Sequence, residues 1–365
     1  MNESLKDIAG KFAIEGEILK IEPLGSGLIN DTYKVFTSGD TPDYVLQRIN
    51  NSIFKDVELL QRNIEIVTDH IRKKLEQAGE TDIKRKVLKF IPIKENGTRT
   101  YCAVDGQFWR MSEFIPDSYT YNIVDPEYSY QAGRAFGKFE AMLADLPQQL
   151  GETIPDFHNM ELRWSQLQEA VEADRAGRMA EAESQEILSF LSIHSAEMCK
   201  AESLYRQGLL PKRICHCDSK VNNMLFDASG KVLCVIDLDT VMPSFVFSDF
   251  GDFLRTAANP VAEDSPEISK VNFRMDIFKA FTKGYLESAD SFLSPVEKEM
   301  LPYGALLFPF MQAVRFFADY INGDTYYKIS YPLHNLVRTR NQIALFKSAL
   351  EQKSEMESFI ESIKK

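Results

Sequence analysis

The sequence predicts an α+β protein made of a small β-rich part followed by a larger, mostly helical part. Short apolar runs bounded by turn-forming residues fill the first third of the chain, and apolar residues at helical spacing dominate after Pro126. A strand that ends at Pro116 marks the change. Since 365 residues suffice for two domains, we place these at residues 1–115 and 116–365.

The first domain is expected to hold a sheet and one helix. Strands are predicted at residues 17–23, 31–36, 44–49, 87–92, 100–104 and 107–115, and a helix at residues 54–78. Turn signals such as Asp105-Gly106 separate these strands.

The second domain is expected to be helical. Helices are predicted at residues 128–146, 167–190, 271–289, 295–322 and from 331 to the end. In the first of them the small residues of A-G-R-A-F-G favour close packing. The second is rich in Glu and Ala, which predicts an exposed amphipathic cover.

Composition excludes several classes of protein. The net charge of -12 argues against nucleic acid as a partner, because phosphate backbones attract basic surfaces. No apolar run approaches membrane-spanning length, and the first residues lack the basic and then apolar regions of a signal peptide. We therefore expect a cytoplasmic protein with no membrane partner, and the sequence does not indicate its oligomeric state.

The five cysteines do not suggest a disulfide framework, because their number is odd and they are scattered over a long chain. Cys215-His216-Cys217 could suggest zinc, but a closed zinc site needs four ligands and no second Cys/His pair stands at suitable spacing. Packing of a buried strand is the favoured interpretation of these residues.

The stretch from Ile214 to Asp239 carries the most chemistry. Residues 224–226 and 231–236 are predicted as two short strands around the turn Asp227-Ala228-Ser229-Gly230. Asn223 precedes the first strand and Asp237 follows the second, so the hairpin would bring an amide oxygen and a carboxylate together. These ligands suit a hard cation such as Mg²⁺. Asp218, on the loop entering the hairpin, could then take a proton from an acceptor hydroxyl. The alternative is an ordinary hairpin with turn-forming Asp and Asn at its ends.

This order of residues resembles the catalytic loop and metal-binding strand of the protein-kinase-like fold. The matching residues are His216, Asp218, Lys220, Asn223 and Asp237. Asp237 is followed by Leu238-Asp239 and not by Phe-Gly, which is similar to the small-molecule branch, the aminoglycoside phosphotransferases and choline kinases. The resemblance implies a bilobal fold with a β-rich N-lobe and a larger helical C-lobe, and a reaction that uses ATP and Mg²⁺.

The same resemblance implies roles for these residues. Asp218 would be the catalytic base, Lys220 would meet the transferred phosphoryl group, and Asn223 and Asp237 would hold Mg²⁺. His216 is expected to be structural. Asp239 is a candidate for contact with the acceptor or the metal, and we assign it to the acceptor site. In S-D-F-G-D, Asp249 is expected to brace the catalytic loop through backbone hydrogen bonds, or to cap a helix, or both.

A nucleotide site is predicted in the first domain. Gly25 and Gly27 lie in a strand-turn-strand setting, where glycines let backbone N–H groups approach phosphate. The following strand offers Arg48 for the phosphates, although Gln47 is the alternative, and Glu58 and Glu65 compete as the carboxylate that orients it.

The segment that ends the first domain has two interpretations. Glu113 and Ile115 precede Pro116, where the kinase-like resemblance implies that backbone groups meet the base of the nucleotide. The alternative is an edge strand that runs into a loop.

The acceptor site is expected on the C-terminal helices. Residues 314–327 combine a cation, hydrogen-bonding groups and aromatic faces, which suit a neutral sugar better than a cationic amine. Several strings, among them G-x-G-L-I-N-D-T-Y, V-I-D-L-D-T-V-M-P, D-F-G-D-F-L-R and R-F-F-A-D-Y-I-N-G-D-T-Y-Y, resemble the bacterial N-acetylhexosamine 1-kinases over residues 25–342. That resemblance implies phosphorylation of the anomeric hydroxyl of N-acetylglucosamine or N-acetylgalactosamine, with Arg315, Tyr326 and His158 at the sugar.

Three other functions stay open at this point. The same fold could act on another small acceptor, such as an aminoglycoside, choline or a different sugar. The chain could be a nucleotide-binding scaffold without catalysis. It could also be a glycoside hydrolase that uses Asp218 and Asp237 as a carboxylate pair, although Asn223 and the two glycines would then have no role.

Overall fold

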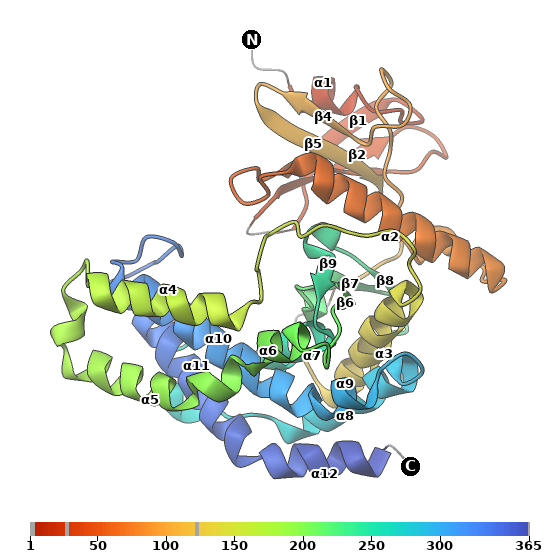
Figure 1. Ribbon diagram of the computed structural model, residues 1–365. Helices are drawn as coiled ribbons and strands as arrows, with labels where there is room; N and C mark the ends of the chain where they lie inside the picture. The colour runs from red at the N-terminus through yellow and green to blue at the C-terminus, as the bar shows by residue number, and fades with distance from the viewer. Residues whose placement is uncertain (1–3, 26–28, 121–123, 364–365) are drawn as a thin grey trace. The chain divides into compact units, whose positions relative to one another are not determined.

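The computed structural model describes residues 4–25, 29–120 and 124–363. Its contacts divide the chain into two compact units, whose elements are labelled in Figure 1. The first unit comprises Met1–Thr120, Asp145–Pro155 and Met224–Met242, and the second comprises Tyr121–Ala144, Asp156–Asn223 and Pro243–Lys365. Two later segments, Asp145–Pro155 and Met224–Met242, thus belong to the unit that contains the sheet. Each unit is therefore built from segments that are separated in the sequence.

The first unit contains an antiparallel sheet in the order β1-β2-β3-β5-β4. Its strands are β1 (Ile18–Pro23), β2 (Asp31–Thr37), β3 (Tyr44–Ile49), β4 (Tyr101–Val104) and β5 (Gln107–Glu113), and its helices are α1 (Leu5–Ala9), α2 (Val57–Gln77) and the 3₁₀ turn η1 (Ile83–Arg85). Val35, Leu46 and Met111 are fully buried in the core of the sheet. Asp105 and Gly106 have φ of 50° and 76°, as the predicted tight turn between β4 and β5 requires.

The strand predicted at residues 87–92 is wrong. This segment touches β5 only intermittently, through Ile91 N to Met111 O at 2.8 Å and Glu113 N to Lys89 O at 2.9 Å. Its pairing with β5 is limited to an isolated antiparallel bridge between Phe90 and Ser112.

The predicted hairpin is present in the first unit. β7 (Met224–Phe226) pairs antiparallel with β8 (Val232–Val235), and Met224 lies opposite Val235. The turn is closed by the Asp227 side chain, which accepts hydrogen bonds from Ser229 N at 2.8 Å and Lys231 N at 3.1 Å. After β8 the chain passes Asp237 and forms the 3₁₀ turn η4 (Leu238–Thr240).

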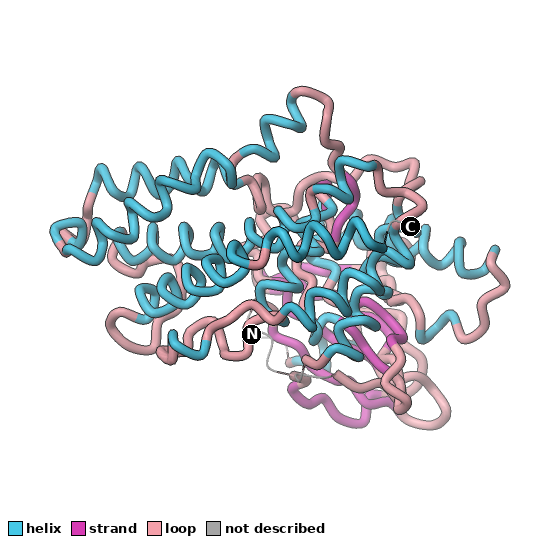
Figure 2. The backbone as a smooth tube through the Cα atoms, turned by 90° about the horizontal axis from the view of Figure 1, so that it is seen from below, coloured by secondary structure: helices cyan, strands magenta, loops and turns pink. Residues whose placement is uncertain are grey.

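The second unit is mostly helical, and Figure 2 shows in cyan how far helices dominate the chain outside the sheet. Its helices are α3 (Pro126–Leu143), α4 (Met160–Ala173), α5 (Ala182–Met198), α6 (Lys200–Arg206), α7 (Val246–Ala257), α8 (Met275–Ala289), α9 (Pro295–Glu299), α10 (Leu301–Ile321), α11 (His334–Glu351) and α12 (Lys353–Ile363). Short elements complete it: η2 (Arg178–Ala180), η3 (Val221–Asn223), η5 (Ile268–Lys270), β6 (Arg213–Cys215) and β9 (Met242–Ser244), which begins at the last residue of the first unit. The predicted fold class, a small antiparallel sheet with a larger helical part, is confirmed.

The single helix predicted at residues 167–190 is wrong. α4 ends where Asp174 adopts a left-handed backbone with φ of 34°, and Gly177, with φ of 67°, starts η2 before α5 begins. Glycine and aspartate stop a helix in this way because they tolerate a left-handed conformation. The predicted helices at 295–322 and from 331 onward are likewise each divided into two, at Met300 and Gln352.

The close packing predicted for the first helix of this unit is confirmed. A Cβ atom on Gly133 of α3 would lie 2.2 Å from Phe281 O of α8, and one on Gly284 of α8 would lie 2.1 Å from Tyr130 O of α3. The two backbones therefore touch where the glycines stand. Among the described residues, the structure has no helix with the length and apolar character needed to cross a membrane.

Candidate active site

The turn between β1 and β2 holds the first predicted nucleotide residue. Gly25 has φ of 74°, a conformation that favours glycine, and the strands close beside it through Leu24 N to Thr32 O at 2.8 Å. Gly27 lies outside the described residues.

Arg48 lies on β3 opposite Asp31 of β2, and the two side chains form an ion pair. Both are nearly half exposed, at 44% and 46%. Glu58 is exposed, and Glu65 accepts a hydrogen bond from the Thr100 hydroxyl. The ion-pair partner of Arg48 is therefore Asp31, and not Glu58 or Glu65 of α2.

A buried guanidinium that the sequence analysis missed lies on the next strand. Arg110 of β5 is only 2% exposed, and its Nε donates to Gln47 Oε1 at 3.0 Å. Its Nη2 forms an ion pair with Asp239 Oδ1 at 2.5 Å. The signal in the sequence was an Arg among the apolar residues of a predicted strand. Such an Arg is expected to be buried, and a buried charge needs a partner of opposite charge.

Asp239 is held firmly within the first unit. Besides Arg110, it accepts from Asn30 Nδ2 at 2.7 Å, and its backbone oxygen accepts from Thr153 Oγ1 at 2.9 Å. The side chain is 4% exposed. These contacts engage the Asp239 carboxylate within the first unit, and its contact with the acceptor stays a prediction.

Glu113 and Ile115 lie at the end of β5. The Glu113 carboxylate pairs with Lys89, and the Ile115 carbonyl accepts from the Ser118 hydroxyl at 2.7 Å. Ile115 is 5% exposed, so its side chain belongs to the core of this unit. Asp237 stands just before η4 with φ of 61° and ψ of 55°, a left-handed conformation that Asp tolerates.

The catalytic-loop candidates of the second unit lie together. Lys220 Nζ is 2.5 Å from Asp218 Oδ1, and Asn223 Nδ2 donates to Asp218 O at 2.7 Å and to Asp218 Oδ2 at 3.2 Å. Burial pushes the pKa of Asp218 upward, but the charge and hydrogen bond of Lys220, with His216 and Asn223, outweigh it and lower the pKa. The carboxylate is therefore ionised at neutral pH and able to accept a proton.

His216 is fully buried behind this loop. Its Nδ1 accepts from Asp218 N at 3.3 Å, and its ring makes edge contacts with Phe136 and Phe139 at 5.7 and 5.9 Å between centroids. These contacts orient the loop from within the core.

Asp249 of α7 binds backbone N–H groups of the same loop. Its two carboxylate oxygens accept from His216 N at 2.7 Å and from Cys217 N at 2.6 Å. Cys217 has φ of 61°, which costs about 1–2 kcal/mol for a residue other than glycine. Hydrogen bonds to a charged group are each worth roughly 1.5–3 kcal/mol, enough to maintain this conformation. The N-cap of α7 is Phe245, so Asp249 braces the loop from within the first turn.

Asp252 and Arg255 lie one turn further along α7, and the sequence analysis assigned them no role. Arg255 donates from Nε to Asp252 Oδ1 at 3.3 Å and from Nη1 to Glu263 Oε2 at 2.5 Å. Burial raises the pKa of Asp252, which also feels the charges of Asp218 and Lys220. Asp218 thus lies near a buried charged network of the same unit.

A second cluster of the same unit contains the acceptor candidates His158 and Arg315. His158 stacks on Phe157 at 4.4 Å between centroids, and the Arg315 guanidinium lies over the rings of Phe157 and Tyr327 at 5.9 and 5.6 Å. Burial, Arg315 and Arg163 lower the pKa of His158 to about 3, and Asp218 acts on it in the opposite sense. The imidazole is therefore neutral at physiological pH and lies close to Asp218.

Several polar atoms of this cluster are buried without a partner among the described residues: His158 Nδ1, Arg163 Nε and Tyr327 Oη. The polar partners recorded for the two guanidiniums are neutral, namely Gln312 Oε1 at 2.8 Å for Arg315, and Gln166 Oε1 and two backbone oxygens for Arg163. A ligand with hydrogen-bond acceptors would satisfy these donors. Arg163 was not predicted from the sequence, and Tyr327 was covered only as the last residue of the predicted acceptor segment 314–327.

The loop that carries the tyrosines is organised by Asp319. Its carboxylate accepts from the backbone N–H groups of Thr325, Tyr326 and Tyr327 at 2.9, 2.8 and 2.9 Å, and from Asn335 Nδ2 at 2.8 Å. Tyr327 points toward Arg315, whereas Tyr326 is 72% exposed at the rim.

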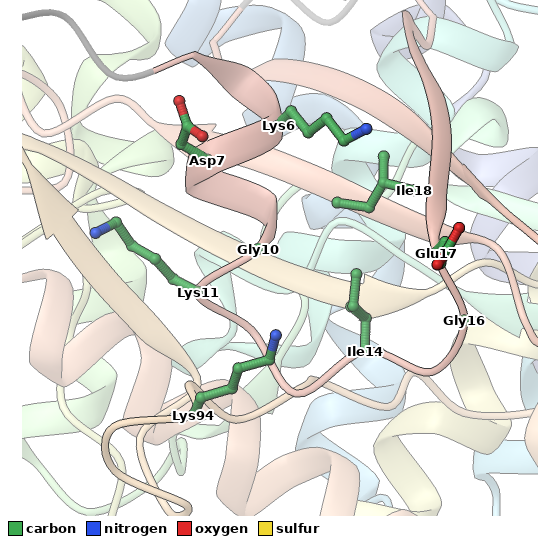
Figure 3. Close-up of a pocket in the computed structure, with 9 residues that line it drawn as sticks. All are labelled: Lys6, Asp7, Gly10, Lys11, Ile14, Gly16, Glu17, Ile18 and Lys94. Carbon is green, nitrogen blue, oxygen red and sulfur yellow. The ribbon is translucent and has the colours of Figure 1, made fainter.

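A hollow of about 880 Å³ lies on the first unit around α1 (Figure 3). Lys6, Lys11 and Lys94 surround it with Asp7 and Glu17, and its other lining residues are Gly10, Ile14, Gly16 and Ile18. Its mixed charges and wide opening give it no chemistry, and it contains none of the described site candidates.

Comparison with known proteins agrees with this arrangement. The model of the phosphotransferase enzyme family, APH, matches residues 20–280. An aminoglycoside phosphotransferase of Alicyclobacillus acidocaldarius has a similar structure, with a TM-score of 0.61 and 14% identity over 99% of this chain and 98% of that one. A choline kinase of Cryptosporidium parvum gives a TM-score of 0.54 and 14% identity over 94% and 91% of the two chains.

A third similar structure is a spectinomycin phosphotransferase in complex with ADP and spectinomycin, with a TM-score of 0.51 and 15% identity over 94% of each chain. At such identities these structures establish the fold, and they say nothing of the acceptor of this chain.

Proposed function

The chain belongs to the phosphotransferase enzyme family, and on that premise we propose that it is an ATP- and Mg²⁺-dependent kinase that phosphorylates the anomeric hydroxyl of an N-acetylhexosamine. The observation that carries the proposal is the group of residues that the second unit assembles around Asp218 and Arg315. The group around Asp218 supplies an ionised base beside a lysine. The group around Arg315 supplies hydrogen-bond donors and aromatic faces near that base.

The base is the part of the proposal with the strongest support. Phosphoryl transfer needs alignment, neutralisation of charge and a group that accepts the proton of the acceptor hydroxyl. Asp218 has a lowered pKa and is held by Asn223, while Lys220 offers a cation for the transferred group.

The donor set fits Mg²⁺. Asn223 Nδ2 is engaged by Asp218, which leaves Oδ1 as the atom of that side chain able to ligate a metal. We assign Asn223 and Asp237 as the ligands, because they flank the paired residues Met224 and Val235 of the hairpin. The ion would neutralise charge on the phosphates of ATP.

The nucleotide is assigned to the first unit. Gly25, Gly27, Arg48, Glu113 and Ile115 remain our candidates for contacts with ATP. Arg110 lies on the same sheet face as Gln47, but its ion pair with Asp239 gives it a structural task.

Charge favours a sugar over a cationic acceptor. Burial and the neighbouring charge of Arg315 lower the pKa of Arg163. Choline or an aminoglycoside would be repelled by two guanidiniums, whereas the hydroxyl and acyl oxygens of an N-acetylhexosamine would accept hydrogen bonds from them. The faces of Phe157 and Tyr327 suit the apolar face of a sugar ring.

Acceptor-dependent release of ADP tests the proposal. The purified protein with Mg²⁺ and ATP is offered N-acetylglucosamine, N-acetylgalactosamine, glucose, choline and an aminoglycoside. We expect turnover with the N-acetylhexosamines and a product that has lost its reducing end. Asp218→Asn should lower kcat by about 10²–10⁴, the usual contribution of a general base.

The panel also separates the alternatives. Turnover with choline or the aminoglycoside and none with the N-acetylhexosamines would refute the acceptor and keep the kinase. ATP binding without ADP release for any acceptor would favour a scaffold, and hydrolysis of an aryl glycoside without ATP would favour the carboxylate-pair hydrolase.

A further inference from the structure

A pair of buried carboxyl groups lies behind the catalytic loop, and the proposed reaction uses only one of them. Glu140 of α3 is 1% exposed and Asp249 of α7 is fully buried. One carboxyl oxygen of each and the Cys215 sulfur all lie within 4.8 Å of one another. Two carboxylates at this separation in a dry interior cannot both be ionised, so one of them keeps a proton.

The contacts indicate which group is protonated. Asp249 accepts two backbone N–H groups, at 2.7 and 2.6 Å, which stabilise its charged form. Glu140 Oε2 accepts a hydrogen bond from the Tyr285 hydroxyl. If both acids are ionised, and so can only accept, the buried Glu140 Oε1 has no hydrogen-bond partner among the described residues. A proton on Oε1 turns that atom into a donor toward Asp249.

The surroundings of Glu140 act in the same direction. Burial, followed by the charge of Asp249 and that of Glu297, raises the pKa of Glu140 well above its usual range. Arg213 of β6 is the nearby cation, and it is engaged by Glu297 at 2.9 and 3.0 Å. The neutral acid is therefore the stable form of Glu140 in the folded protein.

A metal ion does not account for this cluster. Both Asp249 oxygens already accept backbone hydrogen bonds, and burial raises the pKa of the Cys215 thiol well above its usual range. A protonated thiol and an engaged carboxylate are poor ligands. A carboxylic acid that donates to a carboxylate satisfies the same atoms without an ion.

We propose that Glu140 is a positioning residue for Asp218: its protonated carboxyl group donates a hydrogen bond to Asp249 and thereby fixes the carboxylate that holds the His216 and Cys217 amides. The backbone at Cys217 is left-handed and one residue from the base, so a loosened Asp249 would misplace the Asp218 carboxylate. The inference rests on the proposed function only in that Asp218 serves as the base.

Two substitutions of similar size separate a donor from a charge. In Glu140→Gln the amide N–H₂ still donates to Asp249 and the amide oxygen still accepts from Tyr285, so kcat should stay within about threefold of wild type. Glu140→Leu removes the donor, and kcat should fall on the order of 10- to 100-fold, the effect of a displacement of about 1 Å, with little change in KM for ATP or acceptor.

Amide hydrogen exchange of the folded protein gives a readout that needs no turnover. Exchange in a peptide covering residues 213–219 should accelerate in Glu140→Leu and stay slow in Glu140→Gln, while exchange in the sheet of the first unit stays unchanged. Equal loss in both variants would overturn the proposal, as would wild-type exchange and kcat in Glu140→Leu. If Glu140→Leu fails to fold, Glu140→Gln alone decides, because an ionised Glu140 cannot be replaced by an amide.

The two ideas can fail separately. If no acceptor in the panel is phosphorylated, the proposed function is wrong, yet the exchange measurement still tests Glu140. If an N-acetylhexosamine is phosphorylated and the exchange patterns of the two variants are alike, the Glu140 proposal is wrong and the function remains.

Discussion

At the scale of single residues, the charge of Arg315 has the clearest consequence. Its guanidinium lies over two aromatic faces and donates to a neutral amide, so little within the cluster offsets its charge. Arg163 adds a second guanidinium with neutral partners. If this cluster binds the acceptor, as we propose, its charge would favour uncharged or anionic acceptors over amines.

Arg315→Ala should therefore raise KM for the acceptor by about 10- to 100-fold, since a hydrogen bond to a charged group is worth roughly 1.5–3 kcal/mol. KM for ATP should change little, and steady-state kinetics with both substrates measures this difference. Arg206→Ala is the matched control, because Arg206 forms an exposed ion pair with Glu161, with side chains 59% and 36% exposed. Kinetics of Arg315→Ala that equal those of the control would place the acceptor elsewhere.

His158 makes stability depend on pH. Its pKa in the folded protein is about 3 and its ordinary value is 6.5, so the unfolded chain binds the extra proton between these limits. Stability is complete above pH 6.5 and declines as the pH falls toward 3. The free energy of unfolding should be about 2 kcal/mol smaller at pH 5 than at pH 7 from this group alone.

Urea unfolding of the wild type and of His158→Gln at both pH values checks this prediction. The variant should be less stable at pH 7 and should lose less stability on acidification. Parallel changes in the two proteins would show that the imidazole is not desolvated in solution.

At the scale of elements, the contact between α3 and α8 holds the helix that carries Glu140. Glycines on both helices permit the backbones to touch, and the aromatic rings of Phe281 and Tyr285 fill the space beside them. The spacing of small residues in the sequence anticipated this contact. The identity of the partner helix and the burial of Glu140 on α3 could not be anticipated, because they depend on residues more than a hundred positions away.

Gly133→Ala should destabilise the protein by about 1–3 kcal/mol, the usual cost of forcing atoms into a packed interior. The added Cβ would lie 2.2 Å from Phe281 O, a rigid backbone atom. Gly97→Ala is the control, since nothing lies within 4 Å of its Cβ. The midpoint of urea unfolding measures both, and equal midpoints would contradict the close approach of the two helices.

The hairpin and the loop before it illustrate what local signals determine. The order H-x-D, Asn and a turn-bounded pair of strands is visible in the sequence, and β7, β8 and the Asp218–Asn223 contacts appear where expected. The division of the helix predicted at 167–190 was not anticipated, because a single Asp in a left-handed conformation ends α4.

At the scale of the whole molecule, the chain crosses between its two units several times, and segments 145–155 and 224–242 join the unit of the sheet.

Ligands that bind the folded protein and not the unfolded chain stabilise it by mass action. ATP with Mg²⁺ should therefore raise the free energy of unfolding, by about 2.7 kcal/mol at a hundredfold excess over Kd.

Removal of the metal tests the assigned ligands. With EDTA the stabilisation by ATP should largely disappear, and Asp237→Ala should show the smaller value even when Mg²⁺ is present. Thermal or urea unfolding with and without nucleotide measures the difference. Full Mg²⁺-dependent stabilisation in Asp237→Ala would remove Asp237 from the metal site.

The sequence by itself determined the fold class, the tight turn at Asp105-Gly106, the hairpin and the group of Asp218, Lys220 and Asn223, because each depends on residues that are neighbours in the chain. Only the tertiary structure decided that Arg48 pairs with Asp31 while Arg110 takes the buried position beside Asp239, and that Arg163 and Tyr327 join Arg315. These pairings depend on which side chains are buried and on partners that are distant in the sequence. The periodic pattern of apolar residues along a strand or a helix specifies neither.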